Sequence, residues 1–311
     1  MAHRSLYPRP VLVEIAVVGS LNLDTTVRVA HLPSPGETVL GTGHFSDAGG
    51  KGANQAVAAA RLGRRVAMVG LVGDDDAGVT LLRSLADAGV DTSAVGVVED
   101  IGSGIAVITV ADSAENSIVV DPGANRVLDG DRVRAAGGLL GSAAVTLVQL
   151  EVPIDAVVAA AACAGGLLVL NPAPATTLAD HLLRRTDVLV PNATELGTLL
   201  GDAAPVGAEE AGRMATAVHG PAAVVVTLGA DGAVVVEGGR VIHVAAPVVR
   251  AVDPTAAGDA FCGGLADALV RGLGLVDSVR WAVRCGAVAA TRWGAQASLP
   301  TRRDVEALEA V

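Results

Sequence analysis

The run Val66-Ala67-Met68-Val69-Gly70-Leu71-Val72 is apolar at every position. A short strand that is apolar on both faces fits a sheet covered on both sides, which is the usual setting of parallel strands. Similar runs recur along the chain, at Val11–Val18, Val145–Leu150, Leu167–Leu170, Val188–Val190 and Val224–Leu228. Ala-rich segments of helical length separate them. This alternation predicts an α/β fold with three layers, built on a doubly wound and mostly parallel sheet.

Two stretches of the chain lack intervening helices and carry strand-like residues instead. Thr26–Val29 lies in the first stretch, about 24–48, and Ile105–Val110 lies in the second, about 95–122. We expect them to pair as a small β-sheet inserted into a single domain that spans residues 1–311. Such a sheet would cover a pocket as a lid, or bury its apolar face against another copy in a homodimer. A surface hairpin is the alternative.

The charge and the aromatic content weigh against a nucleic-acid partner. The formal net charge is −11, and no arginine cluster forms a basic stripe for a phosphate backbone. Aromatic side chains make up 2% of the chain, which leaves few for stacking on bases. They are Tyr7, Phe45, Phe261, Trp281 and Trp293.

The apolar segments and the cysteines indicate a cytoplasmic protein without a membrane partner. Ala156–Leu170 is long and apolar, but Gly165-Gly166 divides it and Asn171-Pro172 follows it. We therefore expect a helix and then a buried strand there, in place of a membrane span. The cysteines are odd in number and widely spaced, which favours neither a disulfide framework nor a zinc cluster. They are Cys163, Cys262 and Cys285.

The run Ala251–Phe261 places small residues and one carboxylate at the expected start of a helix. Ala256, Ala257 and Gly258 leave the backbone N–H groups uncovered, so the helix could direct its free donors and its positive end at a polyphosphate. Asp259 would lie beside the reacting phosphate, where a carboxylate can accept a proton from the attacking hydroxyl. An ordinary capped helix is the alternative.

The run Gly49–Ala56 opens another predicted helix and contains Lys51, the only lysine in the chain. An ammonium group is compact and has three rotatable donors, so it serves a site in which the planar guanidinium of arginine would not fit. Asn54 follows one helical turn later and adds a donor and an acceptor on the same face. This pair suits the hydroxyls of a sugar, although a glycine-rich helix start alone also explains the run.

Polar residues follow several predicted strands, at the sheet edge where ligands of α/β proteins gather. Asn22 and Asp24 follow the first strand, and their spacing directs both side chains to one side of an extended segment. Later residues of this kind are Gln149, Glu151, Asn192, Glu195 and Gly229. Turn formation or helix capping also accounts for each of them singly.

Val224–Gly232 is a strand that runs into a tight glycine turn, which would let a nucleotide lie close to the backbone or would form a hairpin. Two common nucleotide motifs are missing. No G-x-x-x-x-G-K-[ST] motif surrounds Lys51, and no G-x-G-x-x-G motif follows the first strand. Walker-type ATPases and ordinary dinucleotide enzymes are therefore disfavoured.

Together, these segments resemble the ribokinase branch of the phosphofructokinase B (PfkB) carbohydrate kinase family, from about Ile15 to the C-terminus. Gly49–Ala56 is similar to the N-terminal signature of the family and Asp253–Gly264 to its C-terminal signature. Leu170–Ala175 and Gly294–Gln296 are similar to runs of the ribokinase branch. The resemblance implies a ribokinase-like fold and an ATP-dependent transfer of phosphate to O5 of D-ribose, which gives D-ribose 5-phosphate.

The resemblance also implies roles for the matching residues. Asp259 would be the general base, and the backbone amides of Ala256–Asp259 would form an anion hole. The sugar would be bound by Asn22, Asp24, Gly50, Lys51, Asn54, Glu151 and Asp259. ATP would be bound by Asn192, Thr227, Gly229, Gly232, Ala256, Ala257 and Gly258. Mg²⁺ would be held through water by Glu195, and an activating K⁺ by Asp253, Thr255, Ala289, Arg292, Gly294 and Ser298.

Other functions fit the same residues. A nucleoside kinase presents the same ribose hydroxyl to the same base, but Phe45 is the one aromatic of the lid segments that could stack on a nucleobase. A fructose-type kinase is favoured by Pro254, which resembles other sugar kinases of the family. Outside the enzymes, the chain could be a regulator that binds a sugar or a nucleotide, although Asp259 and its helix start are intact.

Overall fold

The computed structural model describes residues 13–113 and 115–308. In this part of the chain, nine strands form the main sheet. Their order across the sheet is β13 (Arg240–Val244), β12 (Ala233–Glu237), β11 (Ala223–Thr227), β10 (Val188–Leu189), β9 (Leu167–Leu170), β8 (Val145–Val148), β1 (Ile15–Val18), β4 (Val66–Gly73) and β5 (Asp91–Val98). Neighbouring strands are parallel from β11 to β5, and an antiparallel hairpin of β12 and β13 completes one edge.

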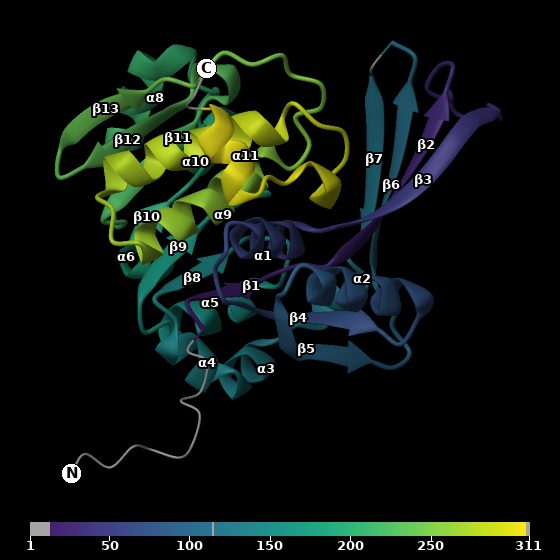
Figure 1. Ribbon diagram of the computed structural model, residues 1–311, viewed down its shortest axis with the longest axis horizontal. Coiled ribbons are helices and arrows are strands. Elements are labelled where there is room, and N and C mark those ends of the chain that lie inside the picture. The colour runs from purple at the N-terminus through teal and green to yellow at the C-terminus, as the bar shows by residue number, and fades with distance from the viewer. Residues whose placement is uncertain (1–12, 114, 309–311) are drawn as a thin grey trace.

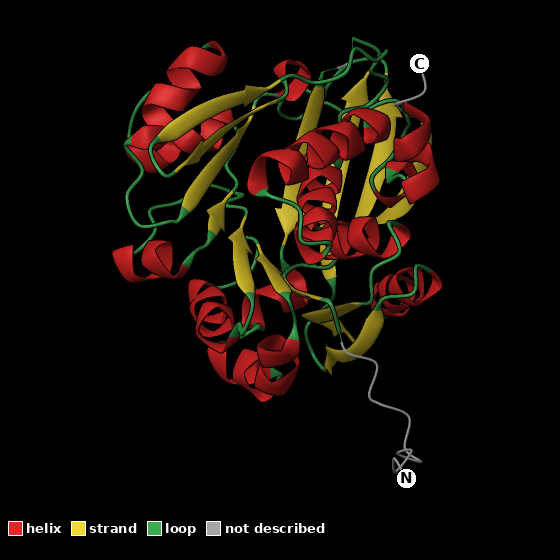
Figure 2. Ribbon diagram, turned by 60° about the vertical axis from the view of Figure 1, so that its left-hand side comes forward, coloured by secondary structure: helices red, strands yellow, loops and turns green. Residues whose placement is uncertain are grey.

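Helices cover both faces of this sheet, because side chains alternate between the faces along each buried strand. Ile15 and Val17 of β1 belong to one apolar cluster, whereas Ala16 and Val18 belong to the other. The first cluster packs against α1 (Lys51–Arg61), α2 (Asp76–Asp87), α9 (Ala257–Val270) and α10 (Leu275–Ala289). The second packs against α3 (Gly130–Ala135), α4 (Gly137–Ser142), α5 (Ile154–Cys163), α6 (Asp180–Arg185), α7 (Ala193–Leu200) and α8 (Gly207–Thr216). The predicted three-layer architecture is therefore confirmed (Figures 1 and 2).

The short C-terminal helix α11 (Arg302–Ala307) closes a smaller cluster against α10. Three short 3-10 helices occur in the described segments, at η1 (Gly123–Val127), η2 (Gly229–Asp231) and η3 (Gln296–Ser298). None of the described helices is long and apolar enough to cross a membrane. The predicted helix and strand within Ala156–Leu170 are confirmed as α5 and β9.

A second sheet projects from the main body, as Figure 1 shows at its upper right. We call it the lid sheet, and its strand order is β3 (Gly41–Gly49), β2 (Asn22–Val29), β6 (Gly104–Ala111) and β7 (Asn116–Asp121). The pair of β2 with β6 is parallel, and the outer pairs are antiparallel. The expected pairing of the two inserted stretches is confirmed.

One predicted boundary was wrong. The second insertion was expected to start near residue 95, but residues up to Val98 belong to β5, which pairs in parallel with β4 in the main sheet. β5 is an edge strand, and its burial alternates between exposed and partly buried residues. Its partial exposure resembles that of the lid strand β6. The lid part of this stretch begins at β6.

Strand ends also differ from the sequence prediction. The first strand was expected at Val11–Val18, but it begins at Ile15, and Val11 lies outside the described residues. The run predicted to end at Leu150 ends as a strand at Val148. The strand predicted at Val224–Leu228 is β11, which begins at Ala223 and ends at Thr227. The turn after it closes the β11–β12 hairpin, so the hairpin interpretation of this run is confirmed.

Two glycines allow the start of α1 to pass close to the segment between β1 and β2. Gly50 has φ of 86°, and a Cβ atom there would lie 2.8 Å from the backbone nitrogen of Asn22. At Gly52 a Cβ atom would lie 2.7 Å from the backbone carbon of Gly19. Larger residues at either position would push the two segments apart. The motif Gly49–Ala56 is therefore placed directly against the carboxyl end of β1.

Candidate active site

The start of α9 has the geometry predicted for an anion-binding site. Ala256 is the N-cap, and its left-handed backbone, with φ of 58° and ψ of 6°, turns the chain sharply into the helix. Ala257 N–H donates to the Pro254 carbonyl at 3.1 Å, whereas the N–H groups of Gly258 and Asp259 meet no acceptor among the described residues. These free donors and the positive end of the helix dipole favour a negatively charged group here.

Asp259 lies in the first turn of α9 and is 7% exposed. Asn54 Nδ2 donates to its Oδ2 at 3.0 Å, and Gln55 Nε2 donates to its Oδ1 at 3.1 Å. Burial raises the pKa of Asp259, while the Lys51 charge and the two amide donors work in the opposite direction. A buried carboxylate with raised pKa and fixed orientation has the properties of a general base.

Lys51 is the first residue of α1, and it lies among carboxylates. Burial works to lower the pKa of Lys51, but the charges of Asp259, Glu151 and Glu195 outweigh it, so its pKa lies above the ordinary value. The side chain is therefore a charged ammonium at neutral pH. The one lysine of the chain is therefore partly buried and lies near three carboxylates.

Glu151 joins the loop after β8 to the start of α1. Its Oε2 accepts from the Ser20 hydroxyl at 2.5 Å and from the Lys51 backbone N–H at 3.0 Å. Ser20 is fully buried and was assigned no role from the sequence. Because Ser20 lies in the turn after β1, its partnership with Glu151 becomes visible only when β1 and β8 are known to be adjacent.

Asn22 and Asp24 both lie on β2, at the base of the lid sheet, as the sequence predicted. Asn125 Nδ2 donates to Asn22 Oδ1 at 2.8 Å, which fixes the Asn22 amide. Burial, and then the charges of the nearby Glu151, Asp47 and Asp259, together raise the pKa of Asp24 to about 7. A carboxyl group that is near its pKa at neutral pH can both donate to and accept from sugar hydroxyls.

A cavity of about 240 Å³ lies between the start of α1, the start of α9 and the predicted nucleotide side. Its walls include Lys51, Glu195, Pro254, Asp259 and Cys262. The other residues of its lining are Asn171, Ala173, Val190, Asn192, Thr227, Ala256 and Gly258. Lys51 and Asp259, from the two signature motifs, therefore face one space. The remaining predicted sugar residues do not line this cavity; they are Asn22, Asp24, Gly50, Asn54 and Glu151.

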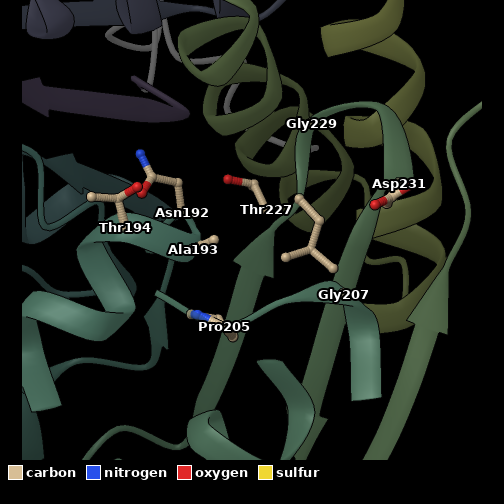
Figure 3. A pocket seen from close by; sticks show the side chains of 9 residues that line it. Asn192, Ala193, Thr194, Pro205, Gly207, Thr227, Gly229 and Asp231 are labelled. Atoms are coloured by element: carbon tan, nitrogen blue, oxygen red, sulfur yellow. The ribbon is translucent and has the colours of Figure 1, made fainter. Parts of the chain in front are cut away.

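A second cavity of about 280 Å³ adjoins the first, since Asn192 and Thr227 line both. Figure 3 shows the Thr227 hydroxyl pointing to the side of the cavity on which Asn192 lies. Gly229 and Asp231 line the far side. Gly232 does not line either cavity; its carbonyl accepts from the Leu228 N–H at 2.8 Å and closes the turn. Of the predicted ATP residues, Asn192, Thr227 and Gly229 thus line this second cavity, and Ala256 and Gly258 line the first. Ala257 lines neither cavity, and Gly232 supports the turn that carries Gly229.

Glu195 forms a capping box at the start of α7. Its Oε2 accepts from the Asn192 backbone N–H at 2.8 Å, and its own N–H donates to Asn192 Oδ1 at 2.8 Å. The capping interpretation of this motif is therefore confirmed. Burial raises the pKa of Glu195, and the side chain also lines the cavity that contains Lys51 and Asp259.

The residues predicted to hold a monovalent cation come from two loops that Asp253 ties together. Asp253 Oδ1 accepts from Thr255 N–H at 2.9 Å, and its Oδ2 accepts from Gly294 N–H at 3.0 Å. The Ser298 hydroxyl is buried and donates to the Ala295 carbonyl at 2.8 Å. Two predicted members serve other contacts: Ala289 accepts from Arg292 N–H at 3.1 Å, and the Arg292 side chain pairs with Asp304 at 2.9 Å.

The chain resembles characterised carbohydrate kinases along almost its whole length. The model of the pfkB family carbohydrate kinases matches residues 13–302. A ribokinase from Haemophilus influenzae is 40% identical over 296 residues, which cover 93% of this chain and 96% of that protein. A deoxyribokinase from Salmonella typhi is 36% identical over 295 residues, which cover 93% of this chain and 96% of that protein.

The fold agrees with a solved structure of this group. An Arabidopsis thaliana ribokinase complexed with ribose and ATP superposes with a TM-score of 0.87 at 31% identity, covering 95% of this chain and 98% of the other. The predicted ribokinase-like fold is thereby confirmed. With a family match across both signature motifs and a relative at 40% identity, the chain belongs to the pfkB family of carbohydrate kinases.

Proposed function

We propose that this protein transfers the γ-phosphate of ATP to O5 of D-ribose and so makes D-ribose 5-phosphate. The observation that carries the proposal is the Asp259 carboxylate, which is buried at the start of α9 beside two free backbone N–H groups. The relatives named ribokinase, and the ribokinase that binds ribose and ATP, supply the substrate class.

In this mechanism Asp259 accepts the proton of the sugar hydroxyl as that oxygen attacks the phosphorus. Its two amide partners hold both carboxylate oxygens, so the base needs little reorganisation. The negative charge of the transferring phosphate develops in front of the free N–H groups of Gly258 and Asp259, where the positive end of α9 stabilises it; of the predicted anion hole Ala256–Asp259, the Ala257 N–H is already bonded to the Pro254 carbonyl. Lys51 adds a full positive charge on the other side of the same cavity.

The sugar would lie between the start of α1 and the base of the lid sheet. Asn22 and Asp24 reach it from β2, and Glu151, Lys51 and Asn54 reach it from the body. Gly50 belongs to the same site, because its backbone lies against Asn22 where a side chain would fill the space. These groups alternate donors and acceptors, which is what a ring of hydroxyls requires.

ATP would lie along the second cavity, with its phosphates at α9. Asn192, Thr227 and Gly229 line this path, and Gly232 fixes the turn beside them. Mg²⁺, which lowers the charge repulsion between the phosphates, fits near Glu195 through water. Among the described residues no donor occupies Glu195 Oε1, so this oxygen is free to accept from a hydrated ion.

K⁺ fits the two loops that Asp253 joins, since a monovalent cation prefers uncharged oxygen ligands from a preformed backbone. The Thr255 and Gly294 N–H groups both donate to the Asp253 carboxylate, which holds the two loops together. Backbone carbonyls of Ala289, Arg292 and Gly294 and the Ser298 hydroxyl would complete the set. A bound cation would order the loop that leads into α9, and so the free N–H groups at its start.

The lid sheet suits a symmetric homodimer. It carries exposed apolar side chains at Ile105, Val107, Ile118, Val119 and Val120, and a second copy would cover them.

The cysteines are all unpaired thiols, and ATP is the proposed phosphate donor, so we assign the enzyme to the cytoplasm.

The experiment that tests the function measures ADP release with ribose, 2-deoxyribose, fructose and adenosine, in the presence of Mg²⁺ and K⁺. Ribose should give the highest kcat/KM. A preference for 2-deoxyribose would assign the chain to the activity named for its Salmonella typhi relative. A preference for adenosine would mean that Phe45, which is 46% exposed on β3, stacks on a base. If no substrate causes ADP release, the function would instead be that of a regulator that binds a sugar or a nucleotide.

A further inference from the structure

Four carboxamide side chains connect the sheet to Asp259 within the protein interior. Gln149 Nε2 donates to Gln55 Oε1 at 2.6 Å, and Gln55 Nε2 donates to Asp259 Oδ1 at 3.1 Å. Gln55 Nε2 also donates to Asn171 Oδ1 at 3.2 Å, and Asn171 Nδ2 donates to the Val190 carbonyl at 2.9 Å. Asn54 is the fourth, and it donates to the other oxygen of Asp259.

Gln55 and Gln149 have no exposed surface, and burial of polar groups without a structural or functional use is costly. We call the hydrogen-bonded carboxamides Gln149, Gln55, Asn171 and Asn54 the relay. It joins the carboxyl end of β8, the carboxyl end of β9, helix α1 and helix α9. Neither hydrophobic cluster needs an amide at these positions. The amides therefore serve the carboxylate at the end of the relay.

The direction of every bond in this relay follows from Asp259. An ionised carboxylate only accepts hydrogen bonds, so Gln55 must present its NH₂ group to Asp259 and its oxygen to Gln149. Gln149 must then donate as well. The Oε1 atom of Gln149 lies against Gly19, where a Cβ atom would collide with it, so the glycine leaves room for this carboxamide. If Gln149 did not donate, the Gln55 amide could turn over and direct its oxygen at the carboxylate.

We propose that Gln55 is a positioning residue for phosphoryl transfer, which holds the Asp259 carboxylate toward the attacking hydroxyl and is itself held by Gln149. This inference rests on the proposed role of Asp259 as the general base. The sugar itself is bound by other residues, so the relay acts on the transfer step and leaves ribose binding largely unchanged.

Besides Gln55, several charged or titratable groups affect the pKa of Asp259. Lys51 of α1 stabilises its ionised form, whereas Glu151 after β8 disfavours it. Glu195 of α7, Asp24 of β2 and the Cys262 thiol of α9 also interact with the charge of Asp259. Without the Gln55 donor, the pKa of Asp259 rises, so a higher pH is needed to ionise the base.

The test compares Gln55→Met and Gln149→Met, which keep the side-chain length and remove the donors. At saturating ATP, we expect kcat of Gln55→Met to be reduced about 10-fold at neutral pH. This factor is smaller than the whole contribution of a general base, because Asp259 itself is still present. The acid limb of its kcat profile should move up by about one pH unit, the shift expected for one lost donor. The KM for ribose should change less than about twofold, since the sugar contacts remain.

Gln149→Met should move the acid limb in the same direction by a smaller amount, and it carries the test if Gln55→Met fails to fold. Thr146→Val is the matched control: the Thr146 hydroxyl is fully buried on β8 and has no partner among the described residues, so its loss should leave the kcat profile in place.

A uniform loss of kcat at every pH, or a change in KM alone, would mean that the amides only support the fold, and the inference would be overturned. Asp259→Asn separates this result from a failure of the proposed mechanism. If Asp259→Asn is inactive and the glutamine variants leave the profile unmoved, only the relay is refuted. If Asp259→Asn turns over normally, the assignment of the base is refuted instead.

Discussion

The backbone N–H of Lys51 donates to the Glu151 carboxylate at 3.0 Å, although 100 positions separate the two residues. Gly50, the N-cap residue of α1, has no side chain that could accept a hydrogen bond from the first turn of the helix. The Glu151 carboxylate accepts one instead, and so it caps α1 from another part of the chain. The backbone at Lys51 is thus held from outside the helix. Its side chain is left free for a ligand.

Lys51→Arg should weaken ribose binding, because the backbone stays fixed while the compact ammonium is replaced by a larger, planar group. We expect the KM for ribose to rise roughly 10-fold, which corresponds to the loss of one charged hydrogen bond. Steady-state kinetics with ribose as the varied substrate measures this. Unchanged ribose affinity would show that the identity of the cation does not matter. Arg83→Lys on the exposed face of α2 is the control for a change of cation elsewhere.

Asp259→Asn should lower kcat by roughly 10²–10⁴ and leave ribose binding intact, since the amide keeps the shape of the carboxylate but cannot accept the proton. Turnover is followed by ADP release, and ribose binding by calorimetry on the same preparation. A variant with near wild-type turnover would remove Asp259 from the role of the base. Asp267→Asn is not a suitable control, because Asp267 is buried and paired with Arg64 and Arg302.

Asp24→Asn should stabilise the ribose-free protein at alkaline pH. Burial, and then the charges of Glu151, Asp47 and Asp259, raise the pKa of Asp24 from 3.8 to about 7. Above about pH 4 the unfolded chain loses the proton of Asp24, whereas the folded protein keeps it until the pH reaches about 7. The free energy of unfolding therefore falls as the pH rises from about 4 through 7, and it does not fall further for this reason at higher pH. The asparagine variant avoids this loss, which is at most about 4 kcal/mol.

Thermal unfolding at pH 5 and pH 8 measures this effect. The melting temperature of Asp24→Asn should exceed that of the wild type at pH 8, and the difference should shrink at pH 5. Asp87→Asn, at an exposed position at the end of α2, provides the comparison. An equal difference at both values of pH would mean that the titration of Asp24 is not its cause.

Ile118→Lys combined with Val119→Lys should convert the proposed dimer to a monomer. Adjacent residues of β7 point to opposite faces of the lid sheet, so this pair of changes charges both faces at once. Sedimentation velocity should show the mass fall to that of one 30.8 kDa chain. Val248→Lys, at a fully exposed position in the body, should leave the mass unchanged. A wild-type protein that already sediments as a monomer would contradict the proposal.

The sequence predicted the separate motifs better than the contacts between them. Lys51 stands out because it is the only lysine of the chain, and Asp259 because a carboxylate directly follows three small residues at an expected helix start. Gln55 does not stand out, since a glutamine in the middle of a helix is typical of an exposed face. Only the packing of α1 against α9 shows that its side chain is fully buried.

Two ambiguities limited what the sequence could predict about the rest of the fold and the site. Glu195 satisfies a capping box with the same atoms that could hold a hydrated ion, so sequence cannot separate the two uses. The edge strand β5 alternates in burial like a lid strand, and its place in the main sheet depends on pairing with β4. Both ambiguities concern residues whose local pattern is satisfied equally by two arrangements in space.

The register of the lid sheet has a mechanical consequence. Asn22, the first residue of β2, is paired with Gly104, the first residue of β6, and with Gly49, the last residue of β3. Three of the four connections between body and lid therefore lie side by side. A swing of the sheet about these connections would carry Asp24 of β2 with it. In the proposed mechanism, the strand that binds the sugar is then also part of the element that moves. Opening of the lid would take the proposed sugar site apart, and product release would need no separate trigger.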